Sequence, residues 1–262
     1  MSENGTIQEA RIESLYIWPV KGLSGLALKE AQIEPHKPLA HDRRWAIERG
    51  ARVFDPLNPR HVPKGKFLQL VNTARLAELE SRYDPQTATL TLLRKGEQVA
   101  KGQLTTPVGR HIIEQFLAAW LGDEIPGPPR VVGAGEHHFF DVPKPYLSLI
   151  NLASVADIAR VVGKPVHKER FRANIYIEGP EAWEEFSWLG KTILVNGKPM
   201  FVAQERIGRC IATGVNPETG ERDMNIPRTM LDVYGHKDCG LYLEPIAEGV
   251  IRPGDRISIA ET

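Results

Sequence analysis

The feature that most constrains the fold is a succession of short apolar segments, most of them ended by turn-forming residues. These segments partly alternate between apolar and polar positions and are rich in β-branched or aromatic side chains, as β-strands are. The 23 glycines and 20 prolines of the 262-residue chain provide many of the breaks. Strands are expected at residues 12–16, 26–33, 44–48, 67–71, 87–93 and 98–102, and again at 173–177, 191–195, 200–204, 210–215, 241–245 and 255–259. The predicted fold class is therefore mainly β with peripheral helices.

Three segments depart from this pattern and predict helices. Thr106 can cap a helix that has Pro107 at its first position, and apolar side chains recur at helical spacing from there to Gly122. Further helices are expected over about residues 153–162 and 226–234. Between two predicted strands, the dipeptide Asn196-Gly197 is typical of a tight β-hairpin.

A proline-rich stretch near the middle of the chain predicts a division into two domains. The sequence IPGPP at residues 125–129 favours a rigid, extended connector. We therefore expect one domain over residues 1–130 and a second over residues 131–262.

Charge and hydropathy exclude several classes of protein. Lysine plus arginine and aspartate plus glutamate number 33 each, so net charge indicates neither nucleic acid nor an anionic membrane as a partner. The opening sequence MSENGTIQEA lacks the basic start and apolar run of a secretory signal. The longest apolar run, LSLINLASVADIARVVG, is interrupted by Asp157 and Arg160. We expect a cytoplasmic protein, in which its two cysteines would not form a structural disulfide.

One of these cysteines has neighbours that indicate a functional site. A free cysteine in a strand is ordinarily a small buried apolar residue. Arg209 precedes Cys210 directly and Arg206 lies four residues before it, and positive charge favours the thiolate, the form that attacks electrophiles or binds metals. A turn predicted at residues 216–220 would place Cys210 near the exposed end of a hairpin.

Three kinds of chemistry are compatible with such a cysteine. A cysteine hydrolase needs a histidine base, and neither His236 nor any of the other histidines lies in a recognisable catalytic signature. A zinc site needs three or four ligands, and Cys210, Cys239 and His236 lack the usual spacing. The third possibility is a thiolate that binds a soft transition metal whose other ligands belong to an organic cofactor.

Five motifs, in register along nearly the whole chain, resemble a known family. R-F-R-A-N-I at residues 170–175, R-C-I-A-T-G-V-N-P-E-T-G-E-R-D at 209–223 and G-V-I-R-P-G-D-R-I at 249–257 resemble the MOSC domain, the C-terminal module of molybdenum cofactor sulfurases. Y-I-W-P-V-K-G at 16–22 and H-D-R-R-W at 41–45 resemble the N-terminal β-barrel domain that accompanies MOSC in amidoxime-reducing components and their bacterial relatives. The resemblance implies a barrel-type MOSC fold preceded by a smaller β-barrel domain.

The resemblance also implies a molybdopterin-type molybdenum cofactor, bound between the domains, with Cys210 as the catalytic residue and thiolate ligand. Residues implied or predicted to bind the cofactor are Lys21, Arg43, Arg172, Asn174, Arg209 and Thr213. A phosphate bearing nearly two charges suits arginine donors. Arg172 and Asn174 lie two apart in a predicted strand, hence on one face, which favours a shared ligand. Arg43 could instead pair with Asp42 or Glu48.

The activity implied is reduction of N-oxygenated small molecules, such as N-hydroxylamines or amidoximes. No cluster of four cysteines follows the second domain, so no intrinsic iron–sulfur cluster is expected and electrons would come from a separate ferredoxin or flavoprotein. Pyridoxal phosphate is not expected. A non-catalytic carrier of the cofactor or of sulfur is the alternative.

Some residues depart from the motifs or have simpler interpretations. Gly22 and Gly208 stand where several relatives carry serine. Cys239 is expected to be structural, and the segment 221–223 to be a solvated strand end.

Overall fold

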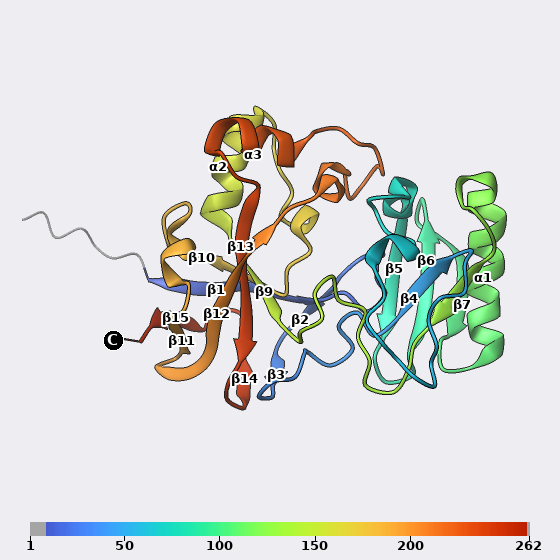
Figure 1. The fold of residues 1–262 in the computed structure, drawn as a ribbon, viewed down its shortest axis with the longest axis horizontal. Coiled ribbons are helices and arrows are strands. Elements are labelled where there is room, and N and C mark those ends of the chain that lie inside the picture. Colours follow the sequence, from blue (N-terminus) through green and yellow to red (C-terminus); the bar gives the residue numbers. More distant parts are fainter. Residues whose placement is uncertain (1–8, 261–262) are drawn as a thin grey trace, which may run out of the picture.

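A closed ring of seven strands forms the larger part of the molecule (Figure 1). The computed structural model describes residues 9–260. The ring consists of β1 (Ala10–Ile17), β9 (Leu147–Asn151), β10 (Ile175–Glu178), β11 (Thr192–Val195), β12 (Lys198–Gly208), β13 (Asp238–Pro245) and β15 (Arg256–Ile259). The strands follow the order β10-β9-β13-β12-β11-β15-β1, and β10 pairs back onto β1. The prediction of a mainly β fold with a barrel is confirmed.

Alternation along these strands fills the barrel with apolar side chains. In β1, Ile12, Leu15 and Ile17 are buried, and they belong to the same cluster as Leu149 and Phe201 from the second half of the chain. All neighbouring pairs in the ring are antiparallel except β9 and β10. Parallel strands need a crossover, which α2 (Leu152–Val162) supplies.

The first strand of the chain therefore completes a barrel whose other strands follow residue 146. Two short strands extend this connection: β2 (Leu26–Leu28) pairs with β1, and β3 (Ala31–Ile33) pairs with β14 (Gly249–Ile251). The division at residue 130 stays a prediction.

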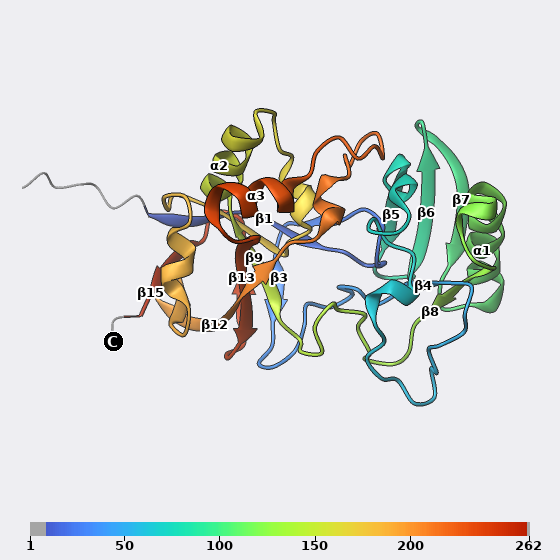
Figure 2. The same ribbon diagram turned by 45° about the horizontal axis from the view of Figure 1, so that its top comes forward.

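The remaining strands form two smaller sheets beside the barrel. A three-stranded sheet contains β5 (Leu79–Asp84), β6 (Thr89–Arg94) and β7 (Glu97–Gln103), and β4 (Ala46–Arg49) pairs with β8 (Pro129–Val132). Figures 1 and 2 show α1 (Pro107–Leu121) covering the side of this region that faces away from the barrel. As predicted, the Thr106 hydroxyl caps α1 by accepting a hydrogen bond from the Gly109 amide at 3.0 Å.

The other helices lie outside the sheets. α2 and α3 (Ile226–Tyr234) were both predicted, and they lie close together at one end of the barrel (Figure 1). The 3₁₀ helices are Lys64–Lys66, Ala74–Glu78, Gly122–Glu124, Lys168–Phe171, Glu184–Trp188 and Ile211–Gly214. Within residues 9–260, no helix has the length and hydropathy to cross a bilayer.

Most predicted strands and the Asn196-Gly197 hairpin are present. Asn196 and Gly197 have φ values of 50° and 79°, the left-handed conformations that a tight hairpin turn requires. The strand predicted at 26–33 is split into β2 and β3 by a bend, while β5, β8, β9 and β14 were not predicted.

Two predicted strands are wrong because each segment forms hydrogen bonds within itself instead of pairing with a neighbouring strand. Residues 67–71 form only one isolated bridge, at Phe67, because the Asn72 side chain bonds the Phe67 carbonyl and the Gln69 amide and folds a local turn. Residues 210–215 contain the 3₁₀ helix Ile211–Gly214 instead of a strand. The partner strand β13 pairs with β12 only as far as Gly208, so the segment that follows bonds to itself.

Candidate functional site

One pocket brings together all seven residues that were predicted to form the site. They come from the segments around β1 and β4, from the turn before β10 and from the segment after β12. These residues are Lys21, Arg43, Arg172, Asn174, Arg209, Cys210 and Thr213. Their roles stay predictions. The pocket also receives Lys64, Asp141, Arg170 and Tyr242, which the sequence analysis did not select.

Cys210 lies directly before a 3₁₀ helix and is half-buried, not at the exposed end of a hairpin strand as expected. Both the Thr213 amide and the Thr213 hydroxyl donate to the Cys210 carbonyl, at 3.1 and 2.9 Å. Thr213 therefore fixes the main chain of the cysteine from within the same helical turn.

An ion pair between a buried arginine and a half-buried carboxylate supports this turn. The Arg170 guanidinium donates to both carboxylate oxygens of Asp223, at 2.9 and 2.7 Å, and to the Thr213 carbonyl at 3.4 Å. The Arg170 side chain is 3% exposed. Its hydrogen bonds hold the pKa of Asp223 below the ordinary value. The expectation that Asp223 belongs to a solvated strand end was therefore wrong, because the turn at 216–220 folds the chain back so that this carboxylate meets Arg170.

The residue before Asp223, Arg222, connects the cysteine segment to the N-terminal part of the chain. Its guanidinium donates to the Leu70 carbonyl at 2.7 Å, to the Val71 carbonyl at 2.9 Å and to the Ile211 carbonyl at 3.0 Å. Arg222 is exposed, as Glu221 is, so the expectation of a solvated segment holds for these two residues even though the Arg222 guanidinium is bonded. Arg222 thus ties the cysteine segment to Leu70, which lines the pocket, without lining the pocket itself.

The two arginines predicted to activate Cys210 are engaged elsewhere. The Arg206 guanidinium lies over the Phe186 ring, 4.1 Å from its centroid, and does not line the pocket. Arg209 lines the pocket but donates to the carbonyls of Cys239 and Phe171. A lining cation that the sequence analysis did not select, Lys64, interacts with both acidic neighbours of the pocket: burial lowers the pKa of Lys64, whereas Asp141 and then Cys210 raise it.

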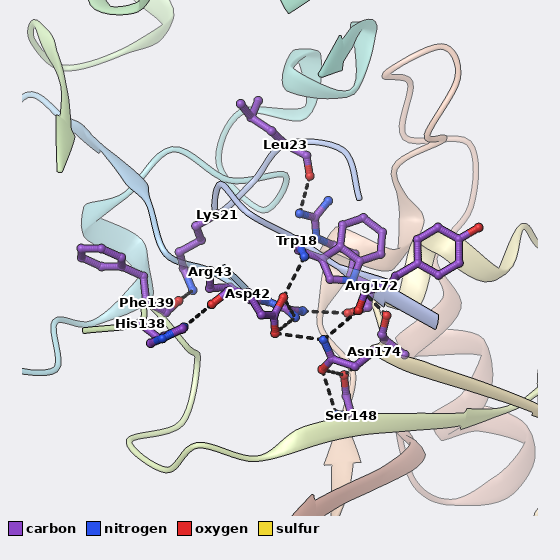
Figure 3. Close-up of polar contacts among 12 residues, drawn as sticks. Trp18, Lys21, Leu23, Asp42, Arg43, His138, Phe139, Ser148, Arg172 and Asn174 are labelled. Carbon is purple, nitrogen blue, oxygen red and sulfur yellow. Dashed lines mark hydrogen bonds and ion pairs between the residues drawn. The ribbon is translucent and has the colours of Figure 1, made fainter. Parts of the chain in front are cut away.

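A buried carboxylate, Asp42, bonds two residues that line the pocket, Arg43 and Asn174 (Figure 3). Its side chain is 2% exposed and accepts hydrogen bonds from the Trp18 amide at 2.7 Å and the Asn174 amide group at 2.9 Å. Arg43 donates to both Asp42 oxygens, at 2.7 and 2.6 Å. Arg43 therefore pairs with Asp42, one of the two alternatives considered, while Glu48 pairs with Arg130.

Arg172 and Asn174 line the pocket from the turn before β10, not from one face of a strand as expected. Arg172 has a φ of 53° and ends the 3₁₀ helix Lys168–Phe171, so the two residues do not share one face of a strand. The Arg172 guanidinium stacks on Trp18, 4.2 Å from the ring centroid, and donates to the Leu23 carbonyl at 2.5 Å (Figure 3). Burial, followed by the charge of Arg43, lowers the pKa of Arg172 to about 9.

The electrostatics of the pocket fit an anionic cofactor. Six cationic side chains line it: Lys21, Arg43, Lys64, Arg170, Arg172 and Arg209. The carboxylates bonded to them are Asp42, Asp141 and Asp223, and within residues 9–260 the buried Arg170 Nε has no hydrogen-bond partner. Buried donors and cations without full compensation are costly, so a phosphate-bearing ligand would stabilise this wall.

The alternatives to such a ligand find less support around Cys210. His236 packs against the rings of Trp183, Phe186 and Tyr234, and the described lining of the pocket contains no histidine. In the described part of the chain, no three His, Cys, Asp or Glu side chains are grouped as a metal site. Cys239 is fully buried, in agreement with a structural role.

The two glycines that stand where relatives carry serine, Gly22 and Gly208, differ in whether the structure has room for a side chain. Gly22 has a φ of 90°, and a Cβ there would lie 2.6 Å from the Leu68 carbonyl oxygen, whereas a Cβ at Gly208 would meet only an Asp238 oxygen at 3.6 Å. We expect Gly22→Ser to lower the free energy of unfolding by about 1–3 kcal/mol and Gly208→Ser to change it by less than about 0.5 kcal/mol. Urea denaturation of both variants measures the difference. Equal losses would contradict the steric account.

Comparison with protein families matches each of the two parts of the chain to a known domain family. Residues 9–119 match the MOSC N-terminal beta barrel domain, and residues 134–258 match the MOSC domain. Together they define a two-part protein of the MOSC class. The chain belongs to the MOSC-domain proteins that carry the N-terminal beta barrel domain, which confirms the resemblance of its motifs.

Individual relatives are distant. Over 126 residues the chain is 31% identical to mitochondrial amidoxime reducing component 2 of Rattus norvegicus, covering 42% of this chain and 36% of that protein. Over 256 residues it is 25% identical to mitochondrial amidoxime-reducing component 1 of Homo sapiens, covering 88% and 74%. Over 272 residues it is 24% identical to the molybdenum cofactor sulfurase of Danio rerio, covering 88% of this chain and 31% of that protein. The aligned parts thus span about a third of the length of two of these relatives.

One solved structure also aligns over most of the chain. The YUAD protein from Bacillus subtilis covers 95% of this chain and 93% of its own, at 13% identity and a TM-score of 0.43.

Proposed function

We propose that this protein binds a molybdopterin-type molybdenum cofactor and reduces N-oxygenated small molecules with electrons from a separate ferredoxin or flavoprotein, in the cytoplasm. The observation that carries the proposal is a half-buried free cysteine in a pocket lined by six cationic side chains. Two of the relatives named above are amidoxime-reducing components, which supports this class of reaction.

Different residues of the pocket would bind the metal and the organic part of the cofactor. Cys210 would provide the thiolate ligand, with its main chain fixed by Thr213. Lys21, Arg43 and Arg172 would bind the phosphate and the pterin, as charge-assisted donors to anionic and polar groups do. When bound, the molybdenum centre would supply the two-electron chemistry that removes the substrate oxygen as water.

Removal of oxygen as water also consumes protons, and Tyr242 is placed to hold one. Its ring lines the pocket, and burial raises the pKa of its hydroxyl, so the proton stays on the Tyr242 oxygen at neutral pH. A protonated hydroxyl can donate a hydrogen bond to a substrate oxygen in the pocket.

A carrier of the cofactor or of sulfur is the second candidate function. The alignment with a molybdenum cofactor sulfurase covers 88% of this chain, and a persulfide on Cys210 would be stabilised by the same cations. Such a protein would bind the cofactor or sulfur without turning over a substrate.

The test combines metal analysis with a turnover assay. The full chain is purified from a host that makes the cofactor, analysed for molybdenum, and supplied with an artificial reductant and an aryl amidoxime. Near-stoichiometric molybdenum and formation of the amidine are the expected results. Molybdenum without turnover of amidoximes or N-hydroxylamines would favour the carrier, and a folded protein without molybdenum would overturn the proposal.

A further inference from the structure

The segment that connects the two smaller sheets to the barrel, residues 133–146, brings a negative charge into the cationic pocket. Its Asp141 is the only carboxylate among the described residues that line the pocket. One Asp141 oxygen lies 2.5 Å from the Lys21 Nζ, and the other lies 3.1 Å from the Lys64 Nζ. A carboxylate that bridges two ammonium groups in this way makes the contacts that a bound phosphate or carboxylate would make.

The two partners in this contact differ in how freely they can move. The Lys21 side chain is 8% exposed and also donates to the Phe139 carbonyl at 2.9 Å, whereas the Asp141 side chain is 43% exposed. Burial lowers the pKa of Lys21 even though Asp141 opposes this effect, so one half-exposed carboxylate compensates the buried ammonium incompletely. Lys21 is thus a fixed cation with an accessible partner. Against the effect of burial, the charges of Lys21 and Lys64 hold the pKa of Asp141 well below its ordinary value, so displacing this carboxylate requires an anion of greater charge.

The main chain is hydrogen-bonded before Asp141, at Phe139, and again where β9 begins, but not at Asp141 itself. The Phe139 amide donates to the Arg43 carbonyl at 2.7 Å, and the chain enters β9 at Leu147. Between these points, the main chain of residues 140–143 makes no hydrogen bond within the described part of the chain. Asp141 can therefore leave the two lysines without breaking a strand or a helix.

We propose that Asp141 is an internal counter-anion, which occupies the position of the ligand's anionic group on Lys21 and Lys64 and is displaced when that ligand binds. This inference rests on the proposed function in one respect, since it requires a phosphate-bearing ligand in this pocket. A phosphate carries close to two negative charges at neutral pH, against one for Asp141, so it can compete for the same ammonium groups. Asp141 then sets how tightly the pocket holds anions.

Binding of inorganic phosphate to the full-length chain tests this inference without the cofactor. Isothermal titration calorimetry compares the wild type with Asp141→Asn and with Glu136→Gln. Glu136 is an exposed residue of the same segment that does not line the pocket. Glu136→Gln therefore serves as a control, because it makes the same change in net charge outside the pocket. We expect Asp141→Asn to bind phosphate at least about tenfold more tightly, which corresponds to about 1.4 kcal/mol, and Glu136→Gln to bind within about twofold of the wild type.

Two further variants check the origin of the gain. Asp141→Ser removes the charge with a shorter side chain and should bind as tightly as Asp141→Asn, while adding Lys21→Met to Asp141→Asn should abolish the gain. Equal or weaker binding by both Asp141 variants would show that Asp141 anchors the pocket, and would overturn the inference. An equal gain in Glu136→Gln, or no binding by any variant, would also overturn it.

These outcomes are separable from those of the proposed function. A wild-type protein that contains molybdenum and turns over amidoximes, but whose Asp141 variants gain no affinity for phosphate, would keep the function and lose the inference. A gain in phosphate affinity confined to the Asp141 variants, in a protein without molybdenum, would keep the inference and overturn the proposed function.

Discussion

The Cys210→Ala variant is expected to lose both its molybdenum and its reductase activity. The thiolate is the ligand that the protein would contribute to the metal, and alanine leaves that position without a donor atom. Loss of outer-shell partners alone typically costs a metal site 10–100-fold, so loss of the ligand itself is expected to cost at least about 100-fold. Elemental analysis and the turnover assay measure the two effects.

Cys239→Ala is the matched control, because it removes the other cysteine of the chain. Cys239 is fully buried, and burial raises its pKa to about 12, so it remains a thiol and acts as a small apolar residue. Its replacement should lower the free energy of unfolding modestly and leave the molybdenum content unchanged. Full turnover by Cys210→Ala, or loss of metal in the Cys239→Ala variant alone, would show that the site has been assigned to the wrong residue.

Replacement of Asp223 by alanine is expected to produce the largest loss of stability. It leaves the guanidinium of Arg170, with a side chain only 3% exposed, without its carboxylate partner. Breaking a buried ion pair from one side typically costs about 3–5 kcal/mol, because the remaining charge is uncompensated. Urea denaturation measures this loss. Because Arg170 also bonds the Thr213 carbonyl beneath Cys210, molybdenum content should fall as well.

Two variants show whether the charge is responsible. Glu221→Ala removes an exposed carboxylate from the same segment and should change the free energy of unfolding by less than about 0.5 kcal/mol. The double variant Arg170→Met/Asp223→Leu removes both charges and should recover most of the loss, since apolar pairs often replace buried ion pairs without cost. A double variant no more stable than Asp223→Ala would contradict this account.

The ion pair also predicts a dependence on pH. The pKa of Asp223 is lowered in the folded state from an ordinary value of 3.8, chiefly by its hydrogen bonds with Arg170. A lowered carboxyl pKa stabilises the folded state above the ordinary value, and this stabilisation is lost as the pH falls through the lowered one. The difference in stability between the wild type and Asp223→Ala should therefore be constant near neutral pH and shrink below about pH 4.

The sequence determined the parts of the molecule that local chemistry controls. Alternating apolar residues fixed most strands of the barrel, the Asn196-Gly197 turn fixed one hairpin, and Thr106 with Pro107 fixed the start of α1. Five motifs in register, including the one around Cys210, also indicated the family. These features depend on spacing and on backbone preference, which can be seen in a short stretch of sequence.

Only the tertiary structure decided which charges face the pocket. Arg206 lies only four residues before Cys210 but packs on Phe186, while Lys64, Asp141 and Arg170 reach the pocket from elsewhere in the chain. Their side chains leave irregular segments and 3₁₀ turns, where no periodicity fixes direction. Their positions depend on closure of the barrel by β1 and on hydrogen bonds between residues far apart in the sequence, so local pattern alone could not assign them.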